Sequence, residues 1–306
     1  MRPHQQSLGE AIMHLAIHNW MKVEPIDVTV RRLAKYGYKS LEIQGEPYKY
    51  DTKAVRKLLD EHDVRCWGSV TLMLDERNLL AQDEAQRAQS VQYTKDCITM
   101  VMELGGEVIS VVPSTVGKIV PDSTPENEWA WCVEAMKEVN DHGRRCGVKI
   151  GIEPINRFET YFVNRGAQAL ALAEAVGPDC GVCLDIFHMN IEEDDPLAAI
   201  RDAAGRLVNF HVADNNRMAC GMGTLDWPTI IETLREVGYD GALSVEFCPP
   251  LDRTPANPFP NSVDTNPEGI SDSERKFLED HGSSVFSADF YEMHVAKSAE
   301  TLLPLI

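Results

Sequence analysis

The sequence of 306 residues lacks any apolar run close to the roughly 20 residues that a membrane-spanning helix needs. Its first residues, 1–6, are polar and lead into no signal-peptide core, so we expect a cytoplasmic location and no membrane partner. Positive charge is also scarce, because the net charge is −19 and no cluster of Lys or Arg exceeds a pair. Proteins that bind nucleic acid concentrate basic side chains on one face, so the composition argues against such a partner.

Two further absences narrow the fold and the chemistry. The eight cysteines are scattered, which is typical of reduced thiols rather than of a disulfide framework. No G-x-G-x-x-G pattern follows an early predicted strand, which disfavours a doubly wound nucleotide-binding sheet. What remains is an ordinary globular composition, with 43% hydrophobic and 25% charged residues, in a chain long enough for one large domain or two small ones.

Strand-type and helix-type segments alternate along the chain. Short apolar runs that predict buried strands are each followed by a longer segment with helical periodicity, and a glycine often ends the helix. The expected strands are 13–17, 41–43, 64–70, 107–112, 148–153, 181–185, 207–212 and 243–247. Eight strands alternating with helices predict a single α/β domain over residues 1–306, a (β/α)8 TIM barrel.

The segment after the eighth expected strand is longer than a minimal barrel requires. Residues 248–287 contain six prolines, so we expect a long proline-rich insertion that serves as a lid or a partner-docking segment. We expect its hydrophobic side chains to order it against the active-site face or a partner: Phe259, Ile270, Phe277 and Phe286. A final helix over 288–303 is expected to place four side chains on one side: Phe290, Met293, Ala296 and Leu303.

Residue types that bind metals occur at the ends of four consecutive predicted strands. Glu153 ends the fifth strand and Asp185 ends the sixth, while His211 and Glu246 lie near the ends of the seventh and eighth. Taken singly, each has an ordinary explanation as a salt-bridge partner, a helix cap or a buried hydrogen-bonding group. Because neighbouring barrel strands bring their C-terminal ends together, we instead expect the four side chains to converge on one point.

Three carboxylates and one imidazole form a mostly oxygen-rich set of ligands. Such a set favours Mn²⁺, with Mg²⁺ or Co²⁺ as alternatives, over a zinc site built from thiolates. A divalent ion here would polarise a sugar carbonyl and stabilise the enolate formed when the neighbouring carbon loses a proton. The ligand set is therefore consistent with metal-dependent removal of a proton from a carbon next to a carbonyl.

Three segments resemble the D-tagatose and D-psicose 3-epimerases, which are xylose isomerase-like TIM barrels of the sugar phosphate isomerase/epimerase superfamily. The segments are Glu-Pro-Ile-Asn-Arg-Phe-Glu-Thr from Glu153, Leu-Asp-Ile-Phe-His-Met-Asn-Ile-Glu-Glu from Leu184, and Asn-Phe-His from Asn209 with the later Asn216-Arg217. The resemblance implies four metal ligands: Glu153, Asp185, His211 and Glu246. It further implies that Glu153 and Glu246 are the catalytic acid/base pair. The substrate-binding residues that it implies are Glu159, His188 and Arg217.

The chain departs from those epimerases in three places. After His211 it reads Val-Ala-Asp-Asn-Asn-Arg, after Glu246 the proline-rich insertion follows, and the segment Val-Pro-Ser-Thr-Val-Gly-Lys-Ile-Val-Pro from Val112 has no epimerase counterpart. These features resemble, more loosely, the catalytic α subunits of C-glycoside deglycosidases. That resemblance implies elimination of the aglycone from a 3-oxo-C-glycoside, with a small β subunit or a homo-oligomer as the partner. We expect this reaction, with ketose 3-epimerisation as the alternative and a non-catalytic sugar-binding barrel as a third hypothesis.

Overall fold

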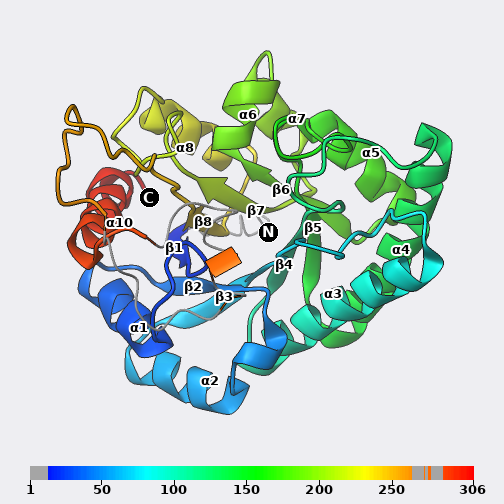
Figure 1. The fold of residues 1–306 in the computed structure, drawn as a ribbon, viewed down its shortest axis with the longest axis horizontal. Coiled ribbons are helices and arrows are strands. Elements are labelled where there is room, and N and C mark those ends of the chain that lie inside the picture. The colour runs from blue at the N-terminus through cyan, green and yellow to red at the C-terminus, as the bar shows by residue number, and fades with distance from the viewer. Residues whose placement is uncertain (1–12, 264–271, 273–274, 277–284) are drawn as a thin grey trace, which may run out of the picture.

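The computed structural model describes residues 13–263, 272, 275–276 and 285–306. Within this part of the chain, eight parallel strands pair in sequence order and close into a barrel that helices surround (Figure 1). The strands are β1 (His14–His18), β2 (Ser40–Gln44), β3 (Arg65–Val70), β4 (Val108–Val111), β5 (Lys149–Ile152), β6 (Cys180–Asp185), β7 (Leu207–Val212) and β8 (Ala242–Val245). The predicted TIM barrel is confirmed.

Helices follow the strands, as the sequence pattern predicts. The helices are α1 (Ile26–Lys35), α2 (Thr52–Glu61), α3 (Glu84–Leu104), α4 (Pro125–Cys146), α5 (Gly166–Val176), α6 (Ile186–Glu192), α7 (Pro196–Asp202), α8 (Trp227–Glu236) and α10 (Ala288–Leu302), with single turns η1 (Pro47–Lys49) and η2 (Leu303–Leu305). Polar side chains begin several of them: Asp83 caps α3 and Thr124 caps α4 by accepting backbone N–H groups. Gly105 ends α3 in the left-handed conformation that glycine adopts without strain.

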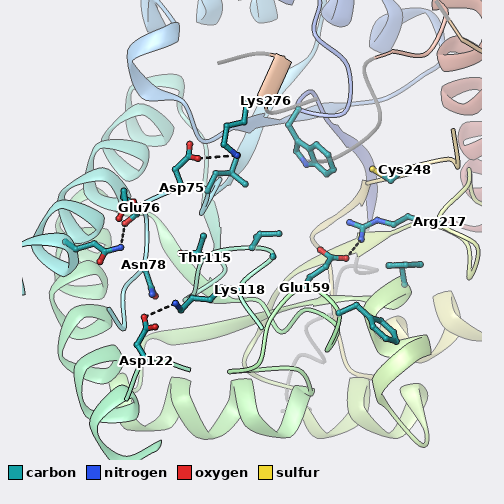
Figure 2. A pocket seen from close by; sticks show the side chains of 17 residues that line it. Asp75, Glu76, Asn78, Thr115, Lys118, Asp122, Glu159, Arg217, Cys248 and Lys276 are labelled. Carbon is teal, nitrogen blue, oxygen red and sulfur yellow. Dashed lines mark hydrogen bonds and ion pairs between the residues drawn. The ribbon is translucent and has the colours of Figure 1, made fainter. Parts of the chain in front are cut away.

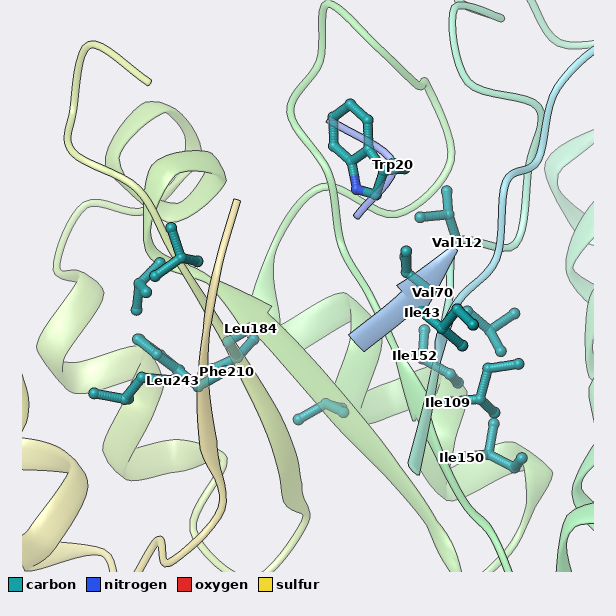
Figure 3. Close-up of a cluster of buried hydrophobic side chains, with 14 of the residues drawn as sticks. Trp20, Ile43, Val70, Ile109, Val112, Ile150, Ile152, Leu184, Phe210 and Leu243 are labelled. Atoms are coloured by element: carbon teal, nitrogen blue, oxygen red, sulfur yellow. The ribbon is translucent and has the colours of Figure 1, made fainter. Parts of the chain in front are cut away.

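The two faces of the barrel strands carry different chemistry. Hydrophobic side chains such as Ile43 and Phe210 belong to the main buried cluster, part of which Figure 3 shows. Their strand neighbours Glu42 and Asn209 project to the opposite face, since successive residues of a strand alternate. There the Asn209 amide donates to both Glu42 oxygens, at 3.0 and 2.9 Å, so β7 and β2 meet across the barrel interior. The interior is therefore polar around Glu42 and Asn209, with a small apolar cluster of Ala16, Trp67, Val108 and Ala242 beside it, and the main hydrophobic core lies on the other face of the strands.

The residues that the sequence places on one side of the final helix are not the ones that the helix buries, apart from Phe290. The side chains of α10 that are buried are Phe290, Tyr291, His294, Val295, Ser298, Ala299 and Leu302, whereas Leu303 is 39% exposed. Polar contacts account for part of this orientation. Tyr38 donates its hydroxyl to Val295 O at 2.9 Å, and the Cys220 N–H donates to Ser298 Oγ at 3.2 Å. A periodicity based on hydrophobic residues alone misses such inward-facing polar side chains.

The described parts of the insertion 248–287 contact α10. The ring of Phe259 lies 5.2 Å from that of Phe290, and buried Phe286 lies 5.3 Å from the same ring. Val263 and Phe286 form an antiparallel bridge. Ile270 and Phe277 lie outside the described residues, and the roles of this segment as lid or partner-docking surface stay predictions.

Two expectations about the chain as a whole can be compared with the structure. All eight cysteines lie in the described residues, and no disulfide joins any of them. Across the described ranges, no helix combines the length and apolar character needed to cross a membrane.

The close pairing of β3 and β4 depends on a residue without a side chain. A Cβ at Gly68 would lie only 2.2 Å from Val108 O and 2.7 Å from Val108 Cγ1. The carbonyl belongs to a paired barrel strand and cannot move away freely. We therefore predict that Gly68→Ala lowers the free energy of unfolding by roughly 1–3 kcal/mol, the usual cost of overpacking, in denaturant titrations.

Gly166→Ala is the matched control for this substitution. At the start of α5, a Cβ on Gly166 would meet its nearest atoms at 3.5 Å, which is ordinary contact. Alanine also favours the helix over glycine, so the free energy of unfolding is expected to stay unchanged or to rise slightly. Equal stability of the two variants would contradict the steric explanation.

Candidate metal centre

The four side chains predicted as metal ligands come together at the C-terminal end of the barrel. Asp185 is the last residue of β6, and Glu153 and Glu246 directly follow β5 and β8. His211 lies in β7, paired with Asp185 in the neighbouring strand. One potential ligand atom of each residue lies within 4.8 Å of those of the other three, and all four residues are buried. The structure thus places three carboxylates and one imidazole around one point.

Two of these carboxylates each have one oxygen fixed by the protein and one that faces the centre without a hydrogen bond. Asp185 Oδ1 accepts the Phe187 N–H at 2.8 Å, and Glu246 Oε1 accepts the Trp20 indole N–H at 3.0 Å. The second oxygens, Asp185 Oδ2 and Glu246 Oε2, are buried and lack a hydrogen-bond partner in the described part of the chain. A buried carboxylate oxygen without a partner is costly, so these two atoms fit a cation between them.

His211 presents one ring nitrogen to the centre and the other to a further carboxylate. Its Nδ1 lies 3.0 Å from Glu153 Oε1 and 3.5 Å from Glu246 Oε2. Its Nε2 lies 3.2 Å from Glu42 Oε1, deeper in the barrel. A carboxylate behind a ligating histidine accepts the second N–H and leaves the other nitrogen free for a metal. Glu42 thus occupies a supporting position.

The electrostatics of the centre follow from the burial of several acids close together. Burial raises the pKa of Glu153 to about 7, although His211 opposes the shift. Burial acts in the same direction on Glu246, but His18 and His211 outweigh it and hold that pKa well below its usual range. Burial lowers the pKa of His211, while the neighbouring thiol and carboxylates raise it well above its ordinary value. A divalent cation would displace the imidazole proton and balance the same carboxylates.

Two residues of this cluster were not predicted from the sequence. His18 ends β1, with its Nε2 3.8 Å from Glu42 Oε2 and 3.9 Å from Glu246 Oε1. The predicted first strand stops at residue 17, one position too early to show that His18 is at a strand end. Glu42 alternates with hydrophobic Leu41 and Ile43, and this alternation is the signal that could have placed it inside the barrel.

The residues predicted to bind substrate lie beside the four ligands. The Arg217 guanidinium lies 3.1 Å from Glu159 Oε1, 3.9 Å from Glu246 Oε2 and 4.5 Å from the centre of the Phe187 ring. Arg217 adopts a left-handed backbone conformation, with φ of 56°. Backbone hydrogen bonds to Asp214 and Cys248 hold it in that strained position.

His188 is buried in the first turn of α6, directly after Asp185. Its Nδ1 accepts the Asn156 backbone N–H at 3.2 Å, so its Nε2 carries the hydrogen and lies 3.4 Å from Asp185 Oδ2. Asp185 also caps α6 through its other oxygen. The helix-cap and metal-ligand explanations of Asp185 are therefore compatible.

A cavity of about 930 Å³ opens beside the centre. Trp20, Glu159, Phe187, Arg217 and Cys248 are among the residues that line it. The candidate ligands are not part of this lining, but Arg217 connects the two, since its guanidinium lies 3.9 Å from Glu246 Oε2. The cavity continues outward between the loops that follow β3 and β4 (Figure 2).

The fold and this site define a (β/α)8 barrel with a candidate metal centre at the C-terminal ends of its strands. Residues 30–281 match the xylose isomerase-like TIM barrel family, and the chain belongs to that family. The resemblance to the tagatose and psicose 3-epimerases is also confirmed by relatives.

A D-psicose 3-epimerase of Ruminiclostridium cellulolyticum is 30% identical over 229 residues, which cover 71% of this chain and 76% of that protein. A ketose 3-epimerase of Arthrobacter globiformis is 29% identical over 226 residues, 73% of this chain and 78% of that protein. The crystal structure of a D-allulose 3-epimerase from Methylomonas sp. in complex with D-allulose superposes with a TM-score of 0.80. It covers 97% of this chain and 98% of its own at 21% identity, a likeness that shows the shared fold.

The support that Glu42 gives to His211 leads to a prediction about metal affinity. In Glu42→Gln the formal charge is lost, and the new amide group faces the donor amide of Asn209, which now bonds to both Glu42 oxygens. We predict that Mn²⁺ binds about 10–100-fold more weakly to this variant, as is usual when the group behind a ligating histidine is removed. Isothermal titration calorimetry measures this change directly.

Glu46→Gln serves as the control for Glu42→Gln. Glu46 lies just beyond β2, where it pairs with Arg77 at 2.9 Å in a half-exposed position away from the centre. Its substitution removes the same charge and is expected to leave the Mn²⁺ affinity unchanged. If both variants lost affinity equally, general electrostatics rather than the support of His211 would explain the effect.

Proposed function

We propose that the protein is a divalent-metal-dependent epimerase that inverts the carbon next to the carbonyl of a ketose. The observation that carries this proposal is the position of Glu153 and Glu246, which project from β5 and β8 towards one centre. Epimerisation needs one group that removes a proton and a second that returns a proton to the opposite face. The names of the relatives, which are ketose and D-psicose 3-epimerases, support the same reaction.

The two glutamates take opposite roles in this proposal. In one direction of the reaction one of them accepts the proton from C3 and the other returns a proton to the opposite face. In the reverse reaction the two roles exchange. A Mn²⁺ ion bound to these glutamates, Asp185 and His211 would supply Lewis-acid polarisation of the carbonyl and the neighbouring hydroxyl.

Three further side chains hold the ketose in this proposal. Arg217 and Glu159 form an ion pair at the inner end of the cavity and offer a donor and an acceptor to sugar hydroxyls. His188 offers its Nε2–H from the side of Asp185. The aromatic rings of Trp20 and Phe187 line the same end and limit the access of water, which strengthens the electrostatic interactions at the centre.

Elimination of an aglycone from a 3-oxo-C-glycoside is the second candidate reaction. It shares the first step, since the enolate formed by proton removal would expel the substituent instead of being reprotonated. The cavity favours it in one respect, because the space beyond Arg217 has room for a substituent. We rank it below epimerisation, in the reverse of the order expected from the sequence, because the names of the relatives support epimerisation.

The acid/base roles predict the effect of two isosteric substitutions. Glu153→Gln and Glu246→Gln each remove one proton-transfer group, so turnover is expected to fall by at least about 10²–10⁴-fold. The measurement is kcat on D-tagatose or D-fructose with saturating Mn²⁺. Glu236→Gln, at an exposed ion pair with Arg201, is the control that should retain activity. Turnover at the wild-type rate in either active-site variant would rule out the acid/base assignment. Sugar binding without any turnover in the wild-type protein would instead indicate a non-catalytic sugar-binding barrel.

A product assay separates the two reactions. The protein is incubated with Mn²⁺ and D-fructose, D-tagatose or a 3-oxo-C-glucoside, and the products are resolved by chromatography. We expect a new ketose to form from a free sugar. A chelator should stop this reaction, and added Mn²⁺ should restore it. Free aglycone without a new ketose would instead establish elimination.

A further inference from the structure

The cavity beside the candidate metal centre is larger than a single sugar requires. A hexose has about a dozen non-hydrogen atoms, and even at the roughly 30 Å³ that one water occupies in the liquid it fills only about 360 Å³. The cavity volume is about 930 Å³. More than half of this space therefore stays empty when one hexose lies against Arg217 and Glu159.

The unused space lies between the loops that follow β3 and β4. We call it the outer part of the cavity and define it by the side chains that line it: Asp75, Glu76, Asn78, Lys118, Asp122 and Phe158. Figure 2 shows Asn78, Lys118 and Asp122 on the side of the cavity opposite Glu159 and Arg217. A ligand that spans both sides must extend well beyond the reacting carbon.

The walls of the outer part are fixed by hydrogen bonds between loops. Val116 N donates to Met73 O at 2.7 Å, which joins the loop after β4 to the loop after β3. Gly117 N donates to Glu159 O at 2.8 Å, which joins it to the loop after β5 as well. A cavity whose walls are tied in this way exists before a ligand binds, as is usual for small-molecule sites.

The chemistry of the outer part selects among possible occupants. Lys118 pairs with Asp122 at 2.8 Å and Lys276 pairs with Asp75 at 3.3 Å, so cations and carboxylates are balanced there. A phosphate group would face these carboxylates. An aryl group would meet the apolar side chains Leu74, Val116 and Phe158 among a larger number of charged and amide side chains. A sugar ring suits the lining, because its hydroxyls bond to carboxylates, amides and ammonium groups alike. Phe158, with 73% of its surface exposed, offers an apolar face to the C–H side of such a ring.

We propose that the outer part of the cavity is a subsite for a second sugar ring, so that the substrate is a keto-sugar carrying a glycosyl substituent. This inference rests on the proposed function, because the keto-sugar ring occupies the inner part next to Glu153 and Glu246. The expected substrate is therefore a glycosyl-ketose of disaccharide size rather than a free ketose. It also disfavours the aryl aglycone of the second candidate reaction.

The test compares ligands of different size on the Mn²⁺-loaded protein. The probes are D-fructose, maltulose and isomaltulose, in which a glucosyl group is attached at O4 or O6 of fructose, and a phenyl 3-oxo-C-glucoside. Dissociation constants come from calorimetry, and kcat/KM from chromatography of the epimerised products. We expect at least one glucosyl-fructose to bind about tenfold or more tightly than D-fructose, since a few net hydrogen bonds supply that factor.

Two variants of the outer part connect this gain to the subsite. Phe158→Ala and Asp122→Ala change exposed side chains, so folding is not at risk. Each is expected to weaken the glucosyl-fructose complex by about threefold to tenfold, while the dissociation constant of D-fructose keeps its wild-type value. Tighter binding of a glucosyl-fructose than of D-fructose, together with the loss of this difference in the two variants, would support a glycosyl subsite.

Other outcomes overturn the inference. Equal affinity for D-fructose and both disaccharides, tighter binding of the phenyl compound, or a gain that survives both substitutions would each exclude the glycosyl subsite. Turnover of D-fructose in those cases would leave the proposed epimerase function standing. Conversely, tight and variant-sensitive binding of a disaccharide without turnover of any ketose would support the subsite and contradict the epimerase function.

Discussion

The constraint on which the site depends is the burial of several carboxylates around two histidines. Glu42, Glu153, Asp185 and Glu246 are at most 5% exposed and surround two histidines in the mouth of the barrel. Carboxylates removed from water at such short range raise one another's pKa unless positive charge lies between them. The low pKa of Glu246 depends on His18 and His211, and that of Glu153 is already raised to about 7. A divalent cation bound between these groups would balance their charge.

The barrel makes this arrangement possible by separating two kinds of packing. Hydrophobic residues on the outward strand face hold the helices, and the polar residues alternate with them towards the interior. The interior network runs from Glu42 and Asn209 through His211 to the candidate ligands, so each ring nitrogen of His211 has a defined partner. The loops after the strands then add Arg217 and Glu159, and the cavity begins directly above them. Stability and chemistry thus occupy opposite faces of the same strands.

Much of this organisation could be predicted from the sequence. Runs such as 207–212 predict β7 at its observed bounds because a buried barrel strand is hydrophobic and short. Equivalent positions at successive strand ends then place Glu153, Asp185, His211 and Glu246 near one another. Local sequence patterns are enough to predict these positions, because a unit of one strand and one helix repeats regularly along the chain.

What could not be predicted depends on contacts between distant segments. His18 was missed because the end of β1 is set by its pairing with β2 and β8, which a local pattern does not show. The inward face of α10 depends on Tyr38 and Cys220, far away in the sequence. The size of the cavity likewise arises from hydrogen bonds among three loops. The resemblance to epimerases lies in the sequence motifs of the site. These motifs do not distinguish epimerisation from elimination, because the two reactions share the same enolate and differ only in its next step.

The central claim is that one divalent cation is held by side chains from four neighbouring strands. Anomalous diffraction from crystals grown with Mn²⁺, with data on both sides of the manganese absorption edge, tests it most directly. The account predicts a single strong anomalous peak within coordination distance of Glu153, Asp185, His211 and Glu246. A map with no peak there, and with the four side chains directed away from one another, would contradict it.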